Sequence, residues 1–171
     1  MSLHFKAAIP RELIFEHIAD YLHLKNLHIS KEDSTRPWGG FFVIEESDAE
    51  NFISLYFPNL TKEALSISGK LSPKILVVAP EKRLSWQFHH RRAEIWKLIG
   101  GVAAVITSDT DEENETKYLK IGDTVQLKQG ERHRLVGLDG WGIVAEIWQH
   151  TDKNDPSDEE DIVRLQDDFG R

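Results

Sequence analysis

The stretch LSWQFHHRRAEIWKLIGG, residues 84–101, alternates apolar and polar side chains and carries a glutamine, two histidines and a glutamate. Alternate residues of a strand share one face, so Gln87 and His89 project together. Glu94 follows across the short connection HRRA, and a hairpin would return it to the same face. The stretch predicts a hairpin that gathers three nitrogen or oxygen donors. The alternative is a solvent-facing strand surface on which these residues bind nothing.

A second stretch, GDTVQLKQGERHRLVG at 122–137, offers a fourth donor, because His133 directly follows the turn sequence KQGER. His133 could instead be a buried structural histidine, and Glu94 an ion-pair partner of Arg92. Two imidazoles, an amide and a carboxylate would leave an open position on a divalent ion, which is typical of a catalytic site. Without thiolates, zinc is expected first, with manganese, iron, nickel and cobalt left open. His90 would point to the opposite face.

Short runs of apolar or alternating residues fill the chain from residue 74 onward and predict antiparallel strands in a sandwich or barrel. These runs are KILVVAP, RLSWQFH, EIWKLIGG, VAAVITSD, TKYLKIG, TVQLKQG, HRLVGL and GIVAEIWQH. Upstream, WGGFFVIEE predicts one more strand. Residues 10–25 have helical spacing, with Leu13, Ile14 and Ile18 on one face. Ser47 and Glu50 have capping-box spacing and predict a short helix over 47–57, with a loop and a helical turn over 57–72.

The composition narrows the class of protein. The chain has 171 residues, which is the length of about one domain. It has no cysteine, so disulfides and zinc–thiolate sites are excluded, and this composition suits a reducing cytoplasm. A net charge of −8 argues against general binding to nucleic acid. Residues 1–21 lack the features of a signal peptide, and no apolar run is long enough for a membrane span. We therefore expect a cytoplasmic location, with no nucleic-acid or membrane partner.

The two donor stretches resemble the paired motifs of the cupin superfamily, a double-stranded β-helix or jelly-roll barrel. In the first motif Gln87, His89, Glu94 and Gly101 take motif positions, while Glu81 stands where the motif has glycine. In the second motif the matching residues are Gly122, Gly130 and His133, with Lys128 in place of proline and Gly137 in place of asparagine. The resemblance implies an all-β cupin domain over 36–171, with an N-terminal helical extension over 1–35 and a short helical insertion. It also implies that Gln87, His89, Glu94 and His133 hold one divalent metal ion.

A closer resemblance is to the type II mannose-6-phosphate isomerase family, which also forms the C-terminal domain of bifunctional mannose-1-phosphate guanylyltransferases. It rests on RPWGG at 36–40, LSWQFHHRRAEIW at 84–96 and EEDIVRLQDDFGR at 159–171. Arg91 and Ile95 replace two histidines of the family run. The sequence shows no glycine-rich phosphate loop like that of the nucleotidyltransferase domain, so guanylyltransferase activity is not carried over.

The resemblance implies a metal-dependent aldose–ketose isomerase with a sugar-phosphate substrate, mannose 6-phosphate or another such as a heptose phosphate. Lys74, Arg83, Arg92 and Arg164 are the candidates to bind the phosphate. The sequence does not single out the catalytic base. A non-catalytic cupin that binds a sugar or a partner protein, or a metal-dependent dioxygenase, is the alternative. A homodimer is expected, since five tryptophans and an added helix offer apolar surface.

Overall fold

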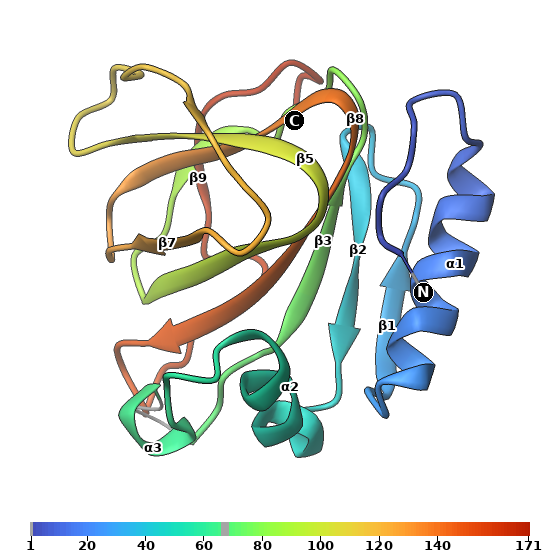
Figure 1. Cartoon of the computed structure of the whole chain (residues 1–171). Coiled ribbons are helices and arrows are strands. Elements are labelled where there is room, and N and C mark those ends of the chain that lie inside the picture. Colours follow the sequence, from blue (N-terminus) through green and yellow to red (C-terminus); the bar gives the residue numbers. More distant parts are fainter. Residues whose placement is uncertain (1, 66–68) are drawn as a thin grey trace.

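Nine antiparallel strands form one sheet that curls into a barrel (Figure 1). The computed structural model describes residues 2–65 and 69–171. The strands are β1 (Ile29–Asp33), β2 (Gly39–Ile44), β3 (Lys74–Val78), β4 (Trp86–Phe88), β5 (Arg92–Ser108), β6 (Lys117–Tyr118), β7 (Thr124–Leu127), β8 (Arg132–His150) and β9 (Val163–Gln166). The predicted antiparallel barrel is confirmed.

Two long strands, β5 and β8, pair with each other along most of their length and serve both walls of the barrel. In one wall, the first half of β5 pairs with β7 and the second half of β8 pairs with β3. In the other wall, the second half of β5 pairs with β6 and the first half of β8 pairs with β4. The bend falls at Gly101, whose φ is +66° and whose missing Cβ would lie 1.8 Å from the Trp141 carbonyl oxygen. We predicted two separate strands in place of β5 and two in place of β8, which was wrong, because each strand continues through its glycines without ending.

Strict alternation on β3 and β8 separates two apolar cores. Ile75, Val77 and Ile143 face outward into a core shared with the helices. Leu76 and Val144 face into the barrel with the apolar residues of β5. Because the side-chain period of a strand is two, the same strands serve both cores.

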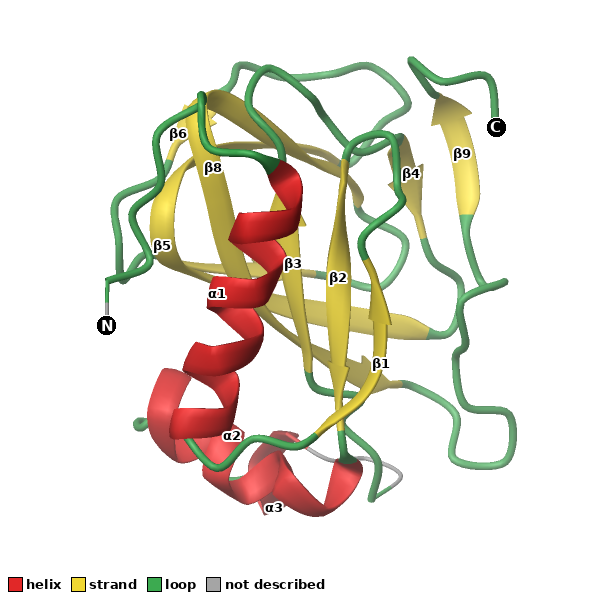
Figure 2. Ribbon diagram, turned by 90° about the vertical axis from the view of Figure 1, so that its right-hand side faces the viewer, coloured by secondary structure: helices red, strands yellow, loops and turns green. Residues whose placement is uncertain are grey.

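The helices cover the outer face of the β2–β3–β8 wall (Figure 2). They are α1 (Arg11–Leu24), α2 (Ala49–Tyr56), which follows a 3-10 turn at Glu46–Asp48, and α3 (Lys62–Leu65). The predicted helix over 10–25 is confirmed, but Leu13 is exposed and Phe15 takes its place in the core. The predicted capping box is wrong, because Asp48 precedes α2 and its carboxylate accepts hydrogen bonds from the His28 amide and ring. No helix of the described residues has the length and apolar character to cross a bilayer.

Two edge strands were not predicted. β1 pairs with β2, so the segment 1–35 contributes a strand to the barrel sheet as well as a helix, and the division at residue 35 stays a prediction. β9 pairs with β4 and draws the C-terminal tail along the barrel. Part of the predicted loop over 57–72, residues 66–68, lies outside the described residues.

Candidate metal centre

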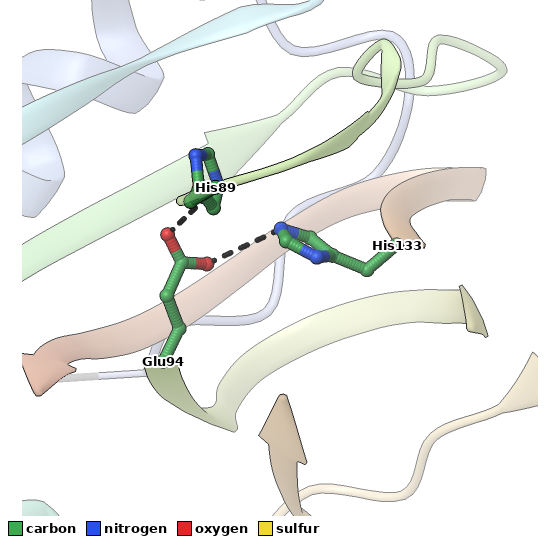
Figure 3. A group of neighbouring side chains, drawn as sticks. All are labelled: His89, Glu94 and His133. Atoms are coloured by element: carbon green, nitrogen blue, oxygen red, sulfur yellow. Dashed lines mark ion pairs between the residues drawn. The ribbon is translucent and has the colours of Figure 1, made fainter. Parts of the chain in front are cut away.

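Three of the four predicted ligands meet inside the barrel. His89 lies just after β4, Glu94 on β5 and His133 on β8, and all three are buried (Figure 3). Their ligand atoms lie within 4.8 Å of one another. His89 Nε2 is 3.2 Å from Glu94 Oε1, and His133 Nε2 is 3.4 Å from Glu94 Oε2. This is a cluster that could hold a metal ion.

The hydrogen bonds of the two imidazoles fix which nitrogen carries the proton. His89 Nδ1 lies 2.6 Å from the Asp161 carbonyl oxygen, and His133 Nδ1 lies 2.9 Å from the Glu131 carbonyl oxygen. A carbonyl can only accept, so Nδ1 donates in both rings and each Nε2 presents a lone pair to Glu94. Such an acceptor behind the ring is the usual partner of a metal-binding histidine.

Two atoms of the cluster are buried without a hydrogen-bond partner: Glu94 Oε2 and His133 Nε2. Both are acceptors in this tautomer, so they cannot satisfy each other, and an unsatisfied buried acceptor is costly. Burial lowers the pKa of His89, which favours the neutral imidazole. Burial alone would raise the pKa of Glu94, but the neighbouring His89 and Arg92 hold that pKa well below its usual range. An ionised, buried carboxylate beside imidazole nitrogens fits a divalent cation.

Gln87, the fourth predicted ligand, lies beside the cluster. It is directly opposite His133 in the pairing of β4 with β8. Its side-chain oxygen accepts a hydrogen bond from the Ser85 hydroxyl. That oxygen therefore already has a donor, and ligation by Gln87 stays a prediction.

Arg92 contacts the cluster directly. Its Nε donates to Glu94 Oε1 at 2.7 Å, and one NH2 nitrogen lies 3.2 Å from His89 Nε2. The guanidinium stacks on Trp148, 3.7 Å from the ring centroid, and also donates to the Ser157 hydroxyl. Arg92 was predicted to bind phosphate, but here it is buried and holds Glu94 in place.

A cavity of about 130 Å³ opens beside the cluster. Glu94, Gln87 and Arg92 line it together with Lys74 and Glu146. Three arginines also line it: Arg36, Arg164 and Arg171. Of the predicted phosphate-binding residues, Lys74, Arg92 and Arg164 thus share the cavity. Arg83 is not among the lining residues and instead makes two hydrogen bonds to the Asp168 carboxylate.

Asp161 in the tail explains why a family signature lies so far from the metal motifs. Its carboxylate accepts hydrogen bonds from the amides of His90 and Arg91 and from the Ser157 hydroxyl. Burial opposes the charge, but these donors lower the pKa of Asp161 to about 2. Its carbonyl also orients His89. The sequence alone showed the signature but not this contact, which only the folded tail creates.

The two departures from the family run lie away from the cluster. Ile95 is buried in the outer core between sheet and helices. Arg91 pairs with Asp155 and Asp158, both at 3.5 Å. Neither replacement therefore removes a donor from the group His89, Glu94 and His133.

The comparisons with known proteins place the chain in a family. Residues 45–167 match the family model described as Mannose-6-phosphate isomerase C-terminal. The alginate biosynthesis protein AlgA of Pseudomonas aeruginosa is 31% identical over 128 residues, which cover 73% of this chain and 24% of that protein. The mannose-1-phosphate guanylyltransferase of Escherichia coli is 29% identical over 157 residues, which cover 90% of this chain and 25% of that protein. The chain thus spans about a quarter of the length of these relatives.

Solved structures share the fold. The capsular polysaccharide assembling protein CapF of Staphylococcus aureus aligns with a TM-score of 0.52 at 14% identity, over 82% of this chain and 34% of that chain. A recombinant oxalate oxidase aligns with a TM-score of 0.52 at 14% identity, over 80% and 61% respectively. At such identities the likeness shows the fold alone. The predicted cupin barrel and the predicted family are confirmed.

Proposed function

Because the chain belongs to the family of mannose-6-phosphate isomerase C-terminal domains, we propose that it is a metal-dependent aldose–ketose isomerase of a sugar phosphate. Mannose 6-phosphate is the first substrate to test, and a heptose phosphate the second. The observation that carries the proposal is the buried cluster of His89, Glu94 and His133 beside a cavity lined by four arginines.

The arginines support a phosphate-binding end of the cavity. Arg36 pairs with Asp33 at 2.8 Å and Arg171 with Asp167 at 2.8 Å. Arg164 lies near both: burial lowers its pKa, and the charges of Arg171 and Arg36 lower that pKa further. No carboxylate lies within ion-pair distance of Arg164 in the described residues. A planar guanidinium that lacks a carboxylate is suited to bidentate contact with a phosphate.

The residues of the chain divide the work of an isomerase. His89, Glu94 and His133 would hold a divalent ion, which when bound supplies Lewis acidity toward a substrate oxygen. Arg164, with Arg36 and Arg171, would hold the phosphate. Trp96 and Trp148 also line the cavity. The open-chain sugar would thus lie with its carbonyl end toward the cluster.

The test is a coupled assay for mannose 6-phosphate isomerisation with protein that has been stripped by a chelator and reloaded with zinc, manganese or cobalt. Turnover that depends on the metal is expected. Arg164→Ala should raise KM by about tenfold or more, the cost of one lost charge-assisted contact. Arg83→Ala is the matched control, since Arg83 lies outside the cavity, and should leave KM unchanged. Absence of turnover with every metal and both substrates would contradict the proposal.

One observation favours a second candidate, a metal-free domain that binds a sugar phosphate without catalysis. The Arg92 guanidinium already places a positive charge against Glu94 and His89. If this charge takes the place of a metal, chelator-treated protein should bind mannose 6-phosphate as tightly as metal-loaded protein. Calorimetric titration of both forms distinguishes the two candidates.

A further inference from the structure

Glu146 is a buried carboxylate of the cavity wall that none of the steps above uses. It lies on β8 opposite Trp96 of β5, next to the pair formed by Glu94 and Trp148. All four side chains therefore face the barrel interior, and diagonal neighbours of this kind lie roughly 7–8 Å apart. Glu146 thus lines the cavity one step along the wall from the metal cluster.

The contacts of Glu146 hold one oxygen and leave the other available. Oε1 accepts a hydrogen bond from Trp96 Nε1 at 2.9 Å. Oε2 lies 3.9 Å from Lys74 Nζ, an ion pair beyond hydrogen-bond distance. Lys74 instead donates to Glu159 at 2.5 Å. Trp96 therefore fixes the carboxylate while its second oxygen can reach a ligand in the cavity.

The other carboxylates of the cavity are less suited to accept a proton from a substrate carbon. Glu94 lies between two imidazoles and accepts a hydrogen bond from Arg92. Glu159 belongs to the tail, its side chain is 57% exposed, and it is paired with Lys74.

The charges around Glu146 also suit a proton acceptor. Burial and, after it, the charge of Glu94 raise the pKa of Glu146 to about 7 against the opposing effects of Lys74, Arg92 and the Trp96 hydrogen bond. Glu159, which also lines the cavity, accepts a hydrogen bond from Lys74. A base with a pKa near the working pH transfers protons most effectively.

We propose that Glu146 is the base that carries the proton between carbons 1 and 2 of the sugar phosphate; this inference rests on the proposed isomerase function. The Glu146 carboxylate takes the proton of carbon 2, the C2–H electron pair forms the C1=C2 bond of an enediol, and oxygen 1 gains a proton. The carboxylic acid then returns its proton to carbon 1, and oxygen 2 loses its proton to become the ketone. The net change is one proton from carbon 2 to carbon 1 and one from oxygen 2 to oxygen 1, with no oxidant or reductant.

The experiment compares Glu146→Gln with the wild-type protein, both metal-loaded, with mannose 6-phosphate in D2O. The amide keeps the size of the side chain and an oxygen for Trp96 but cannot take the proton. We expect kcat to fall by about 10²–10⁴-fold, the usual contribution of a general base. KM and bound metal should stay unchanged, and deuterium should no longer enter the sugar at carbons 1 and 2. Glu160→Gln, the same change on an exposed tail residue outside the cavity, should behave as wild type.

Each outcome separates the two proposals. If the wild type turns over no sugar phosphate, the isomerase proposal fails and the assignment of Glu146 falls with it. If the wild type is active and Glu146→Gln keeps its turnover and deuterium exchange, only the assignment of Glu146 is overturned. Loss of bound metal in Glu146→Gln would also overturn it, since Glu146 would then act through the metal site. If this variant does not fold, Glu146→Asp replaces it. An unchanged kcat in Glu146→Asp, with an unchanged midpoint in the pH dependence of kcat, would contradict the inference.

Discussion

The two faces of the β3–β8 wall are made by the same strands and have different chemistry. The outward residues Ile75, Val77 and Ile147 are apolar and sealed under the helices. The inward residues begin apolar at Val78 and become polar and charged toward the other end of the wall. The outer face therefore stabilises the fold, and the inner face stabilises it at one end and holds the candidate site at the other.

The difference teaches that the apolar core that stabilises this domain and the candidate site lie largely on opposite faces of the wall. The polar end of the barrel holds buried groups without partners, Glu94 Oε2 and His133 Nε2, whose cost the apolar outer core must offset. Changes on the inner face should therefore act chiefly on metal binding and catalysis, and changes on the outer face chiefly on the free energy of unfolding.

The largest effect is expected from His133→Ala. It removes an imidazole that no neighbouring side chain replaces, so metal-dependent isomerisation should disappear, well beyond the roughly 10–100-fold cost of losing an outer partner of a ligand. The coupled assay measures it. His90→Ala is the control, because His90 is exposed and outside the cluster. Wild-type turnover in His133→Ala would contradict the assignment of metal binding and catalysis to the inner face.

The matching change on the outer face is Phe42→Ala. Phe42 is fully buried and packs on Phe15 of α1, with ring centroids 5.3 Å apart. Its loss should lower the free energy of unfolding by about 3–5 kcal/mol and leave metal stoichiometry intact. Denaturant unfolding measures the loss, with the exposed Leu24→Ala as a control expected to stay within about 0.5 kcal/mol of wild type. Loss of metal at equal folded fraction would show that the faces are coupled.

A pH dependence should mark the inner face. The pKa of Glu146 is raised from 4.5 to about 7, so the folded protein holds this proton more tightly than the unfolded chain. The free energy of unfolding should therefore fall as pH rises from about 4.5 to about 7, by up to about 3 kcal/mol. Glu146→Gln should lack this slope. Urea unfolding of metal-free protein at several pH values tests it, and equal slopes in both proteins would contradict the prediction.

The smallest effect is expected from Asp161→Ala, because Asp161 contacts the segment that carries His89 and is not itself a predicted metal ligand. It removes the acceptor for the amides of His90 and Arg91 and loosens the turn that carries His89. Metal affinity should fall by about 10–100-fold, as for other outer partners of ligands. Competition with a chromogenic chelator measures it. Glu160→Ala serves as the control, and an unchanged affinity in Asp161→Ala would limit Asp161 to fastening the tail.

The sequence predicted the barrel where burial enforces alternation, and it failed where burial is absent. Strand β1, ISKED, is mostly exposed and has no apolar period, so it could not be recognised. Strand β9, in the polar tail, is also mostly exposed and could not be recognised for the same reason. Glycines within β5 and β8 were read as strand ends, because glycine marks a turn or loop in many sequences.

The candidate site was predictable to the extent that motif spacing sets it. His89 and Glu94 meet as the hairpin argument predicted, and His133 joins them from the second stretch. Glu146 was missed, because a lone acid in the apolar run GIVAEIWQH carries no spacing signal. Arg83 was assigned to the phosphate because of its charge, whereas its direction is set by the tail residue Asp168, 85 positions away in sequence.

The account depends on one divalent ion held by the inner face, and the most direct test is the metal content of the protein by mass spectrometry. Wild-type protein equilibrated with zinc and dialysed should retain one ion per chain, and His89→Ala and His133→Ala should retain none while remaining folded. A folded wild-type protein that retains no zinc, manganese or cobalt, or His variants that retain as much as wild type, would contradict the account.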